Sequence, residues 1–144
     1  MRVSDILRTK GNEIVTIAPG ATLADASREL SARNFGALVV SEDGVTIVGI
    51  ISERDIVRHV ARNGADALLT SVSEAMTADV RTCGRSDSLE DLMRVMTEHR
   101  IRHLPVVQDA ALCGVVSIGD VVKRRVEQLE NETKDLHDYI QGGR

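Results

Sequence analysis

Aromatic residues are nearly missing from this chain. Phe35 and Tyr139 are the only two among 144 residues, and there is no tryptophan. Proteins that bind single-stranded nucleic acid stack the bases on aromatic side chains, so such a platform is excluded. The net charge of −4 also gives the surface as a whole no attraction for a phosphate backbone. We therefore expect no nucleic-acid partner, and a core of Val, Ile, Leu, Ala and Met.

Long apolar runs are missing as well. No stretch approaches the ~20 residues that a membrane-spanning helix requires. The first residues, Met1 to Asp5, carry no hydrophobic region of the kind found in signal peptides. We therefore expect no membrane partner and a cytoplasmic location.

Cysteine is scarce. Cys83 and Cys113 are the only two, and they do not form a close Cys-x-x-Cys pair. The four histidines show no metal-ligand spacing with them. Both cysteines are expected to be reduced and to behave as small buried apolar side chains. No metal site is expected.

What the chain does contain is its own pattern twice. Residues 49–56, with the sequence GIISERDI, return as residues 114–121, GVVSIGDV. Two further segments repeat in the same order: LAD at 23–25 returns as LED at 89–91, and VSDIL at 3–7 returns as VSEAM at 72–76. Two copies are too few for a solenoid, but they suit a module with pseudo-two-fold symmetry and ligand sites between the copies. A chain of this length forms one domain, or two half-domains that share a core.

Each copy predicts the same order of elements, a βαββα motif behind a short helical lead. Thr22 and Ser88 are good N-caps for the first helix of each copy, and the last helix starts at Ser52 or Ser117. The expected leads are 3–7 and 72–76, the first strands 14–17 and 80–83, and the later strand pairs 37–40 with 47–51 and 103–107 with 112–116. The polar segment 59–71 between the copies is expected to be a loop.

The predicted fold class is α/β (α+β): two βαββα motifs related by pseudo-two-fold symmetry, with a longer C-terminal helix. The first motif with its lead would span residues 1–68, the second 69–126, and the helical extension 127–144. Along this last helix, apolar or small side chains recur at alternating steps of four and three, ending before Gly142-Gly143: Val122, Val126, Leu129, Thr133, Leu136 and Ile140. Such a heptad seam indicates either a helix that packs back on its own domain or a contact in a homodimer.

The segments Ser52 to Asp55 and Ser117 to Asp120 carry the polar chemistry of the repeat. Each lies where a strand gives way to a helix, and the free N–H groups of a helix N-terminus suit a phosphate. A serine hydroxyl there can donate one more hydrogen bond, and an ionised Asp can accept from the two vicinal hydroxyls of a ribose. The alternative is purely structural, with the serines as N-caps and the aspartates as stabilisers of the first helical turn.

The duplicated Gly-x-x-Ser-x-x-Asp segment resembles the cystathionine β-synthase (CBS) domain family. The lead VSDIL, the Ala18-Pro19 turn and the segment RHLPVV at 102–107 fit the same tandem pattern, and the resemblance covers the chain from Val3 to about Val126. It implies a regulatory module that binds an adenosyl ligand such as AMP, ADP, ATP or S-adenosylmethionine in a cleft between the copies. It also implies a homodimer, and a protein partner that the sequence does not identify.

The resemblance implies two clefts of unequal strength. One would hold ribose and phosphate with Ser117 and Asp120, have Arg102 and His103 near the phosphate, and line the base with Ile17, Thr22, Gly36 and Ala37. The other would use Ser52 and Asp55, with Cys83 and Ser88 toward the base. In this second cleft, Gly36-Ala37 takes the place that Arg102-His103 has in the first. The second cleft therefore lacks that cationic pair, although Arg54 can compensate. We expect the Asp120 cleft to be the stronger one.

Three functions compete at this stage. The first is the regulatory module, with the nucleotide as a regulatory ligand and no other cofactor. The second is a structural or oligomerising module without a physiological ligand. The third is an enzyme, which we do not expect, because no nucleophile–base constellation and no metal set are visible, so no residue is assigned a catalytic role.

Overall fold

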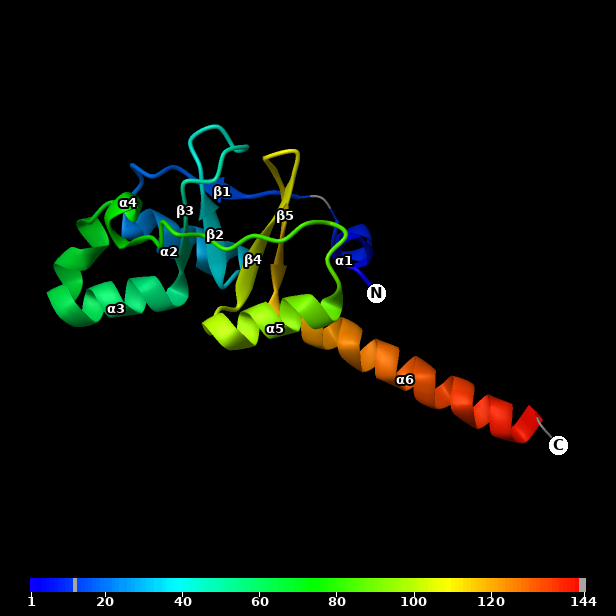
Figure 1. Cartoon of the computed structure of the whole chain (residues 1–144). Helices are drawn as coiled ribbons and strands as arrows, with labels where there is room; N and C mark the ends of the chain where they lie inside the picture. Colours follow the sequence, from blue (N-terminus) through cyan, green and yellow to red (C-terminus); the bar gives the residue numbers. More distant parts are fainter. Residues whose placement is uncertain (12, 143–144) are drawn as a thin grey trace.

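The computed structural model describes residues 1–11 and 13–142, and the elements follow the predicted order except for the first strand of the second copy (Figure 1). The elements are α1 (Val3–Lys10), β1 (Thr16–Ile17), α2 (Leu23–Arg33), β2 (Ala37–Val40), β3 (Gly49–Ser52), α3 (Glu53–Asn63), the 3-10 helix η1 (Gly64–Leu69), α4 (Val72–Ala75), α5 (Leu89–His99), β4 (His103–Gln108), β5 (Ala111–Ser117) and α6 (Ile118–Gly142). The predicted fold class is confirmed, with two small sheets, flanking helices and a long C-terminal helix.

The two sheets repeat one arrangement, but the second is less complete. In the first, β1 lies parallel to β2 and β2 antiparallel to β3. In the second, β4 and β5 are antiparallel, and the predicted strand 80–83 shrinks to one bridge between Cys83 and Val106. The prediction of a full strand there is wrong. Arg81 and Thr82 are exposed, so no burial holds residues 80–82 against the sheet.

The helix starts predicted from the hydroxyl residues are confirmed. At each start the hydroxyl oxygen accepts the backbone N–H of the residue three positions later, at 3.1 or 3.2 Å: Thr22 from Asp25, Ser52 from Asp55, Ser88 from Asp91 and Ser117 from Asp120. Each bond satisfies a donor that the first helical turn leaves free.

The two lead helices are exchanged between the copies. From α1, Val3, Ile6 and Leu7 are buried in the core of the second copy, among leucines of α5 and residues of β4 and β5. From α4, Val72 is buried in the core of the first copy. The sequence copies are therefore not separate packing units, and neither core is complete without a helix from the other copy.

The repeated glycine provides the space for this exchange. A Cβ atom at Gly114 would lie 2.8 Å from Leu7 Cδ2, and one at Gly49 would collide with the sulfur of Met76. Leu7 and Met76 are the matching last residues of the two lead segments. The glycine that opens each Gly-x-x-Ser-x-x-Asp segment therefore lets the lead of the other copy approach its strand.

The segment between the copies is not the loop expected from its polarity. α3 continues to Asn63, and η1 follows directly as far as Leu69. Gly64 ends α3 with a positive φ of 71°, and its N–H bonds to the carbonyl of Val60. Ala67 is buried in this connection, which is why it folds back as a helical turn instead of remaining open.

α6 is the longest element and extends beyond the rest of the molecule (Figure 1). All its residues from 129 to 142 are exposed, so the interpretation that it packs back on its own domain is wrong. Gly143, the second half of the predicted helix stop, lies outside the described residues. Within residues 1–11 and 13–142, no helix has the length and apolar character needed to cross a membrane.

Candidate functional site

The Ser52–Asp55 segment forms a closed polar unit at the start of α3. One carboxylate oxygen, Oδ2 of Asp55, accepts from the backbone N–H and the hydroxyl of Ser52, at 2.9 and 3.0 Å. The other, Oδ1, accepts a weak bond of 3.5 Å from the hydroxyl of Thr77, which follows the exchanged helix α4. All these partners are neutral groups.

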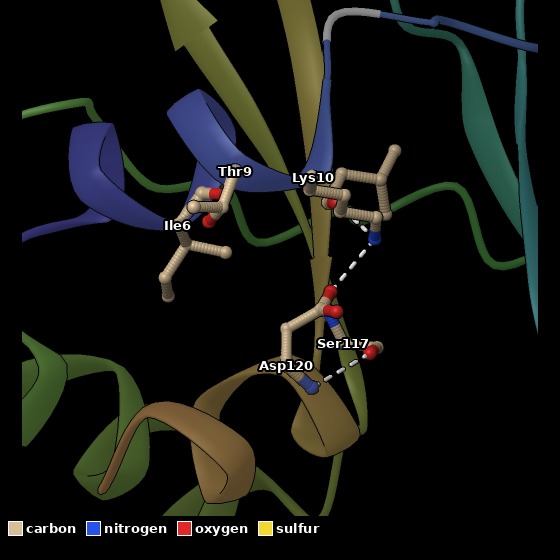
Figure 2. A network of polar contacts seen from close by, with 6 residues as sticks. Ile6, Thr9, Lys10, Ser117 and Asp120 are labelled. Atoms are coloured by element: carbon tan, nitrogen blue, oxygen red, sulfur yellow. Dashed lines mark hydrogen bonds and ion pairs between the residues drawn. The ribbon is translucent and has the colours of Figure 1, made fainter. Parts of the chain in front are cut away.

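The Ser117–Asp120 segment has the same geometry but a charged neighbour. Oδ2 of Asp120 accepts from the backbone N–H of Ser117 at 2.9 Å and from the ammonium of Lys10 at 2.7 Å (Figure 2). Lys10 ends α1 and also donates to the carbonyl of Val115 at 2.9 Å. Burial raises the pKa of Asp120, but the bonds from Lys10 and Ser117 outweigh it and hold the pKa below its usual value. Asp120 is therefore an ionised, half-buried carboxylate.

His103 stands where the two copies meet. A Cβ atom at Gly36 would lie 2.9 Å from both Cε1 and Nε2 of the His103 ring, so the ring occupies space that only a glycine leaves open. Burial lowers the pKa of His103, and the nearby charge of Lys10 lowers it further, while Glu53 and Asp120 act in the opposite direction. The imidazole is thus held in its neutral form close to the Lys10–Asp120 pair.

The arginines expected near a phosphate gather in one open hollow. Arg54 of α3, Arg100 after α5 and Arg102 before β4 line a space of about 350 Å³, together with Ile118 at the start of α6. Among the described residues none of these three arginines forms a salt bridge. Arg54 and Arg102, which the sequence divides between two clefts, therefore share one surface.

The remaining predicted residues lie in the elements expected of them. Ile17 and Ala37 are buried in β1 and β2, while Thr22 and Ser88 cap α2 and α5. Cys83 is buried, and burial, reinforced by the charge of Asp87, raises the pKa of its thiol to about 12. Cys83 is thus an unreactive apolar side chain. Among the described residues, no three His, Cys, Asp or Glu side chains are grouped so that they could hold a metal ion.

Lys10 is the residue that sequence reasoning missed. It lies three positions beyond the repeated lead 3–7, and the matching place in the second copy holds Asp79, so the repeat does not mark it as a cation site. Only the exchange of α1 brings its side chain to Asp120, which is 110 residues away in the chain. No local signal in the sequence could have found this pair.

Comparison with known proteins decides the family. The sequence model of the CBS domain family matches residues 3–62 and 72–127 of this chain. The chain belongs to the CBS domain family. The mitochondrial CBS domain-containing protein CBSX3 of Arabidopsis thaliana is 36% identical over 149 residues, covering 98% of this chain and 72% of that protein. Tandem CBS pairs of this kind are regulatory modules.

Two solved CBS structures share the fold over most of their length. The CBS-domain protein ATU1752 of Agrobacterium tumefaciens superposes with a TM-score of 0.84 at 42% identity, covering 87% of this chain and 99% of that one. The CBS domain pair of protein MJ0100 superposes with a TM-score of 0.76 at 25% identity, covering 85% of this chain and 98% of that one. The MJ0100 pair was crystallised in complex with 5′-methylthioadenosine and S-adenosyl-L-methionine.

Proposed function

We propose that this chain is a regulatory module that binds an adenosyl ligand in the cleft between its two CBS copies. The ligand would be AMP, ADP, ATP or S-adenosylmethionine, and the signal would pass to a protein partner or through rearrangement of a homodimer. The observation that carries the proposal is the half-buried Asp120, which lies at a helix N-terminus of one copy and contacts Lys10 of the exchanged helix. The adenosyl ligands of the MJ0100 pair support the same ligand class.

The chemistry of Asp120 suits a ribose. Its Oδ2 atom is used by Ser117 and Lys10, whereas Oδ1 accepts no hydrogen bond from the described residues. An ionised oxygen with free lone pairs can accept from two vicinal hydroxyls. Ile17 and Ala37 would provide the apolar side of the base, and the N-terminus of α6 would face the phosphate.

The Asp120 cleft is proposed as the stronger of the two. His103 and Lys10 lie beside it, and Arg102 directly precedes β4, whereas the partners of Asp55 are neutral hydroxyl and amide groups. Arg102 is proposed to meet the phosphate from the side of the arginine hollow. Arg54, which lines the same hollow, would then assist this cleft as well as its own.

A second candidate function is oligomerisation without a physiological ligand. The exposed seam of α6, with Val126, Leu129 and Leu136 each at least 45% exposed, favours a homodimer in either case. The two functions differ in whether an adenosyl compound binds. The cytoplasmic location expected from the sequence stays a prediction.

Calorimetric titration with AMP, adenosine and S-adenosylmethionine tests the proposal. Asp120→Ala should weaken binding about tenfold to a hundredfold, because a hydrogen bond to a charged group contributes roughly 1.5–3 kcal/mol. Asp55→Ala should have a smaller effect on the tighter site. Asp91→Ala, at the same third position of α5 and paired with Arg94, is the matched control and should leave affinity unchanged.

Two results would contradict this scheme. If none of the three compounds binds the unmodified protein, the oligomerising function is the better description. If Asp55→Ala weakens binding more than Asp120→Ala, the ranking of the two clefts is wrong.

A further inference from the structure

Lys10 is held at the site by a well-anchored helix. Val3 of α1 is fully buried, Ile6 and Leu7 are almost so, and the backbone N–H groups of Val3 and Ser4 bond at 3.0 Å to the carbonyls of Asp87 and Arg85. The side chain of Lys10 is only 37% exposed. The backbone of α1 therefore holds Lys10 beside Asp120, and its partly exposed ammonium is directed there by hydrogen bonds to Asp120 and to the carbonyl of Val115.

The hydrogen bonds of Lys10 leave one donor free. An ammonium has three N–H groups, and two of them are used by Asp120 and by the carbonyl of Val115. Among the described residues, no third acceptor lies within hydrogen-bond distance of Nζ. A compact positive charge with an unused donor therefore lies beside the carboxylate proposed to hold the ribose (Figure 2).

The other copy offers a natural comparison. At Asp55 the exchanged lead contributes the neutral hydroxyl of Thr77, at 3.5 Å, where at Asp120 it contributes the ammonium of Lys10 at 2.7 Å. The two clefts share the Ser-x-x-Asp geometry and differ in this charge. Any preference of a ligand for the Asp120 cleft that comes from Lys10 must therefore depend on the charge of the ligand.

We infer that Lys10 makes the Asp120 cleft selective for adenosyl ligands with an anionic 5′ group, that is, phosphorylated adenosine. The inference rests on the proposed function. With the ribose on Oδ1 of Asp120, Lys10 stays on Oδ2 and its free N–H donates to a phosphate oxygen, a charge-assisted bond. S-adenosylmethionine carries a positively charged sulfonium at its 5′ position, which the ammonium repels. Unphosphorylated adenosine gains nothing from Lys10.

The test is a titration of the full chain and three variants with AMP, adenosine and S-adenosylmethionine. Lys10→Met keeps the apolar stem and removes the charge, and it should weaken AMP about tenfold, the lower end for a charged hydrogen bond at a partly exposed group. Its affinity for adenosine should stay within about twofold. Lys10→Arg should restore most of the affinity for AMP. Arg8→Met removes the same charge from α1, but Arg8 is paired with Asp5, so this control should behave as the unmodified protein.

The outcomes separate the inference from the function on which it rests. If the unmodified protein binds AMP but Lys10→Met weakens AMP and adenosine equally, or neither, Lys10 does not select the ligand and the inference is wrong while the proposed function stands. Equal affinity of the unmodified protein for AMP and S-adenosylmethionine would overturn it too. If no adenosyl compound binds, both the proposed function and the inference are refuted.

Discussion

Among the titratable side chains at the site, His103 is the one whose ordinary pKa lies closest to neutral pH. Its folded-state pKa lies below the usual value of 6.5, because of burial first and the charge of Lys10 second. The unfolded chain therefore takes up a proton at a higher pH than the folded protein does. The contribution of His103 to the free energy of unfolding is therefore fully present above about pH 6.5. It is lost as the pH drops toward the lower folded-state pKa.

His103→Gln should remove this pH dependence. Urea denaturation at pH 7.5 and pH 5.5 should give a smaller loss of unfolding free energy on acidification for the variant than for the unmodified protein. Lys10→Met should raise the pKa of His103, as followed by the NMR signal of its ring, because a repelling charge is removed. An unchanged His103 titration in Lys10→Met would mean that the lysine does not act on the imidazole.

Part of the candidate site could be predicted from residue types alone, and the rest depends on how distant segments pack. Ser117 and Asp120 were predictable because a hydroxyl and a carboxylate three residues apart suit a helix N-terminus whatever surrounds them. The same logic explains why they also form a plain capping arrangement in the structure. The position of Lys10 depends on contacts between segments more than 100 residues apart, which no local pattern encodes.

At the scale of elements, the exchange of α1 and α4 is the feature with the largest consequence. The repeat predicted the order of helices and strands, because each element has its own periodicity and caps. It could not predict which copy a lead helix packs against, since VSDIL and VSEAM each present an apolar face that could pack on either core. The predictions of a strand at 80–83 and of a loop at 59–71 were wrong for a related reason. The structure of these segments depends on the exposure of Arg81 and the burial of Ala67, which the sequence pattern does not show.

The contact of Gly114 with Leu7 gives this exchange a test. Gly114→Ala should destabilise the protein by about 1–3 kcal/mol, because the new methyl group overlaps the fully packed Leu7 side chain. Leu7→Ala should destabilise it by about 2–4 kcal/mol through the cavity it leaves. The double variant should be more stable than the sum predicts, since the alanine at 114 then fills part of the space left by Leu7. Urea denaturation of the four proteins measures the coupling, and strict additivity would mean that α1 does not pack on β5.

At the scale of the whole molecule, each of the two cores contains a helix from the other copy. The two cores should therefore unfold as one cooperative unit. α1 connects the core of the second copy to β1 of the first, and Lys10 lies on that connection next to the candidate site. A ligand that contacts Lys10 and Asp120 would therefore touch both copies at once. α6 begins at the same site and carries the exposed seam, so the element that holds Asp120 is also the one available for self-association.

The seam of α6 should mediate the proposed homodimer. Leu129 is 45% exposed and lies between Val126 and Leu136 on one face, so in a two-fold pair it would be buried twice. Leu129→Glu should raise the dissociation constant of the dimer about a hundredfold or more, because each lost leucine contributes roughly 1.5 kcal/mol and a charge takes its place. Asn131→Glu adds the same charge on the opposite face of the helix and is the matched control. Analytical ultracentrifugation over a range of concentrations distinguishes them: the control should remain dimeric while Leu129→Glu dissociates. If Leu129→Glu remains dimeric, the homodimer forms through another surface, and α6 is free to contact a different protein. If both variants dissociate equally, the contact does not depend on the seam.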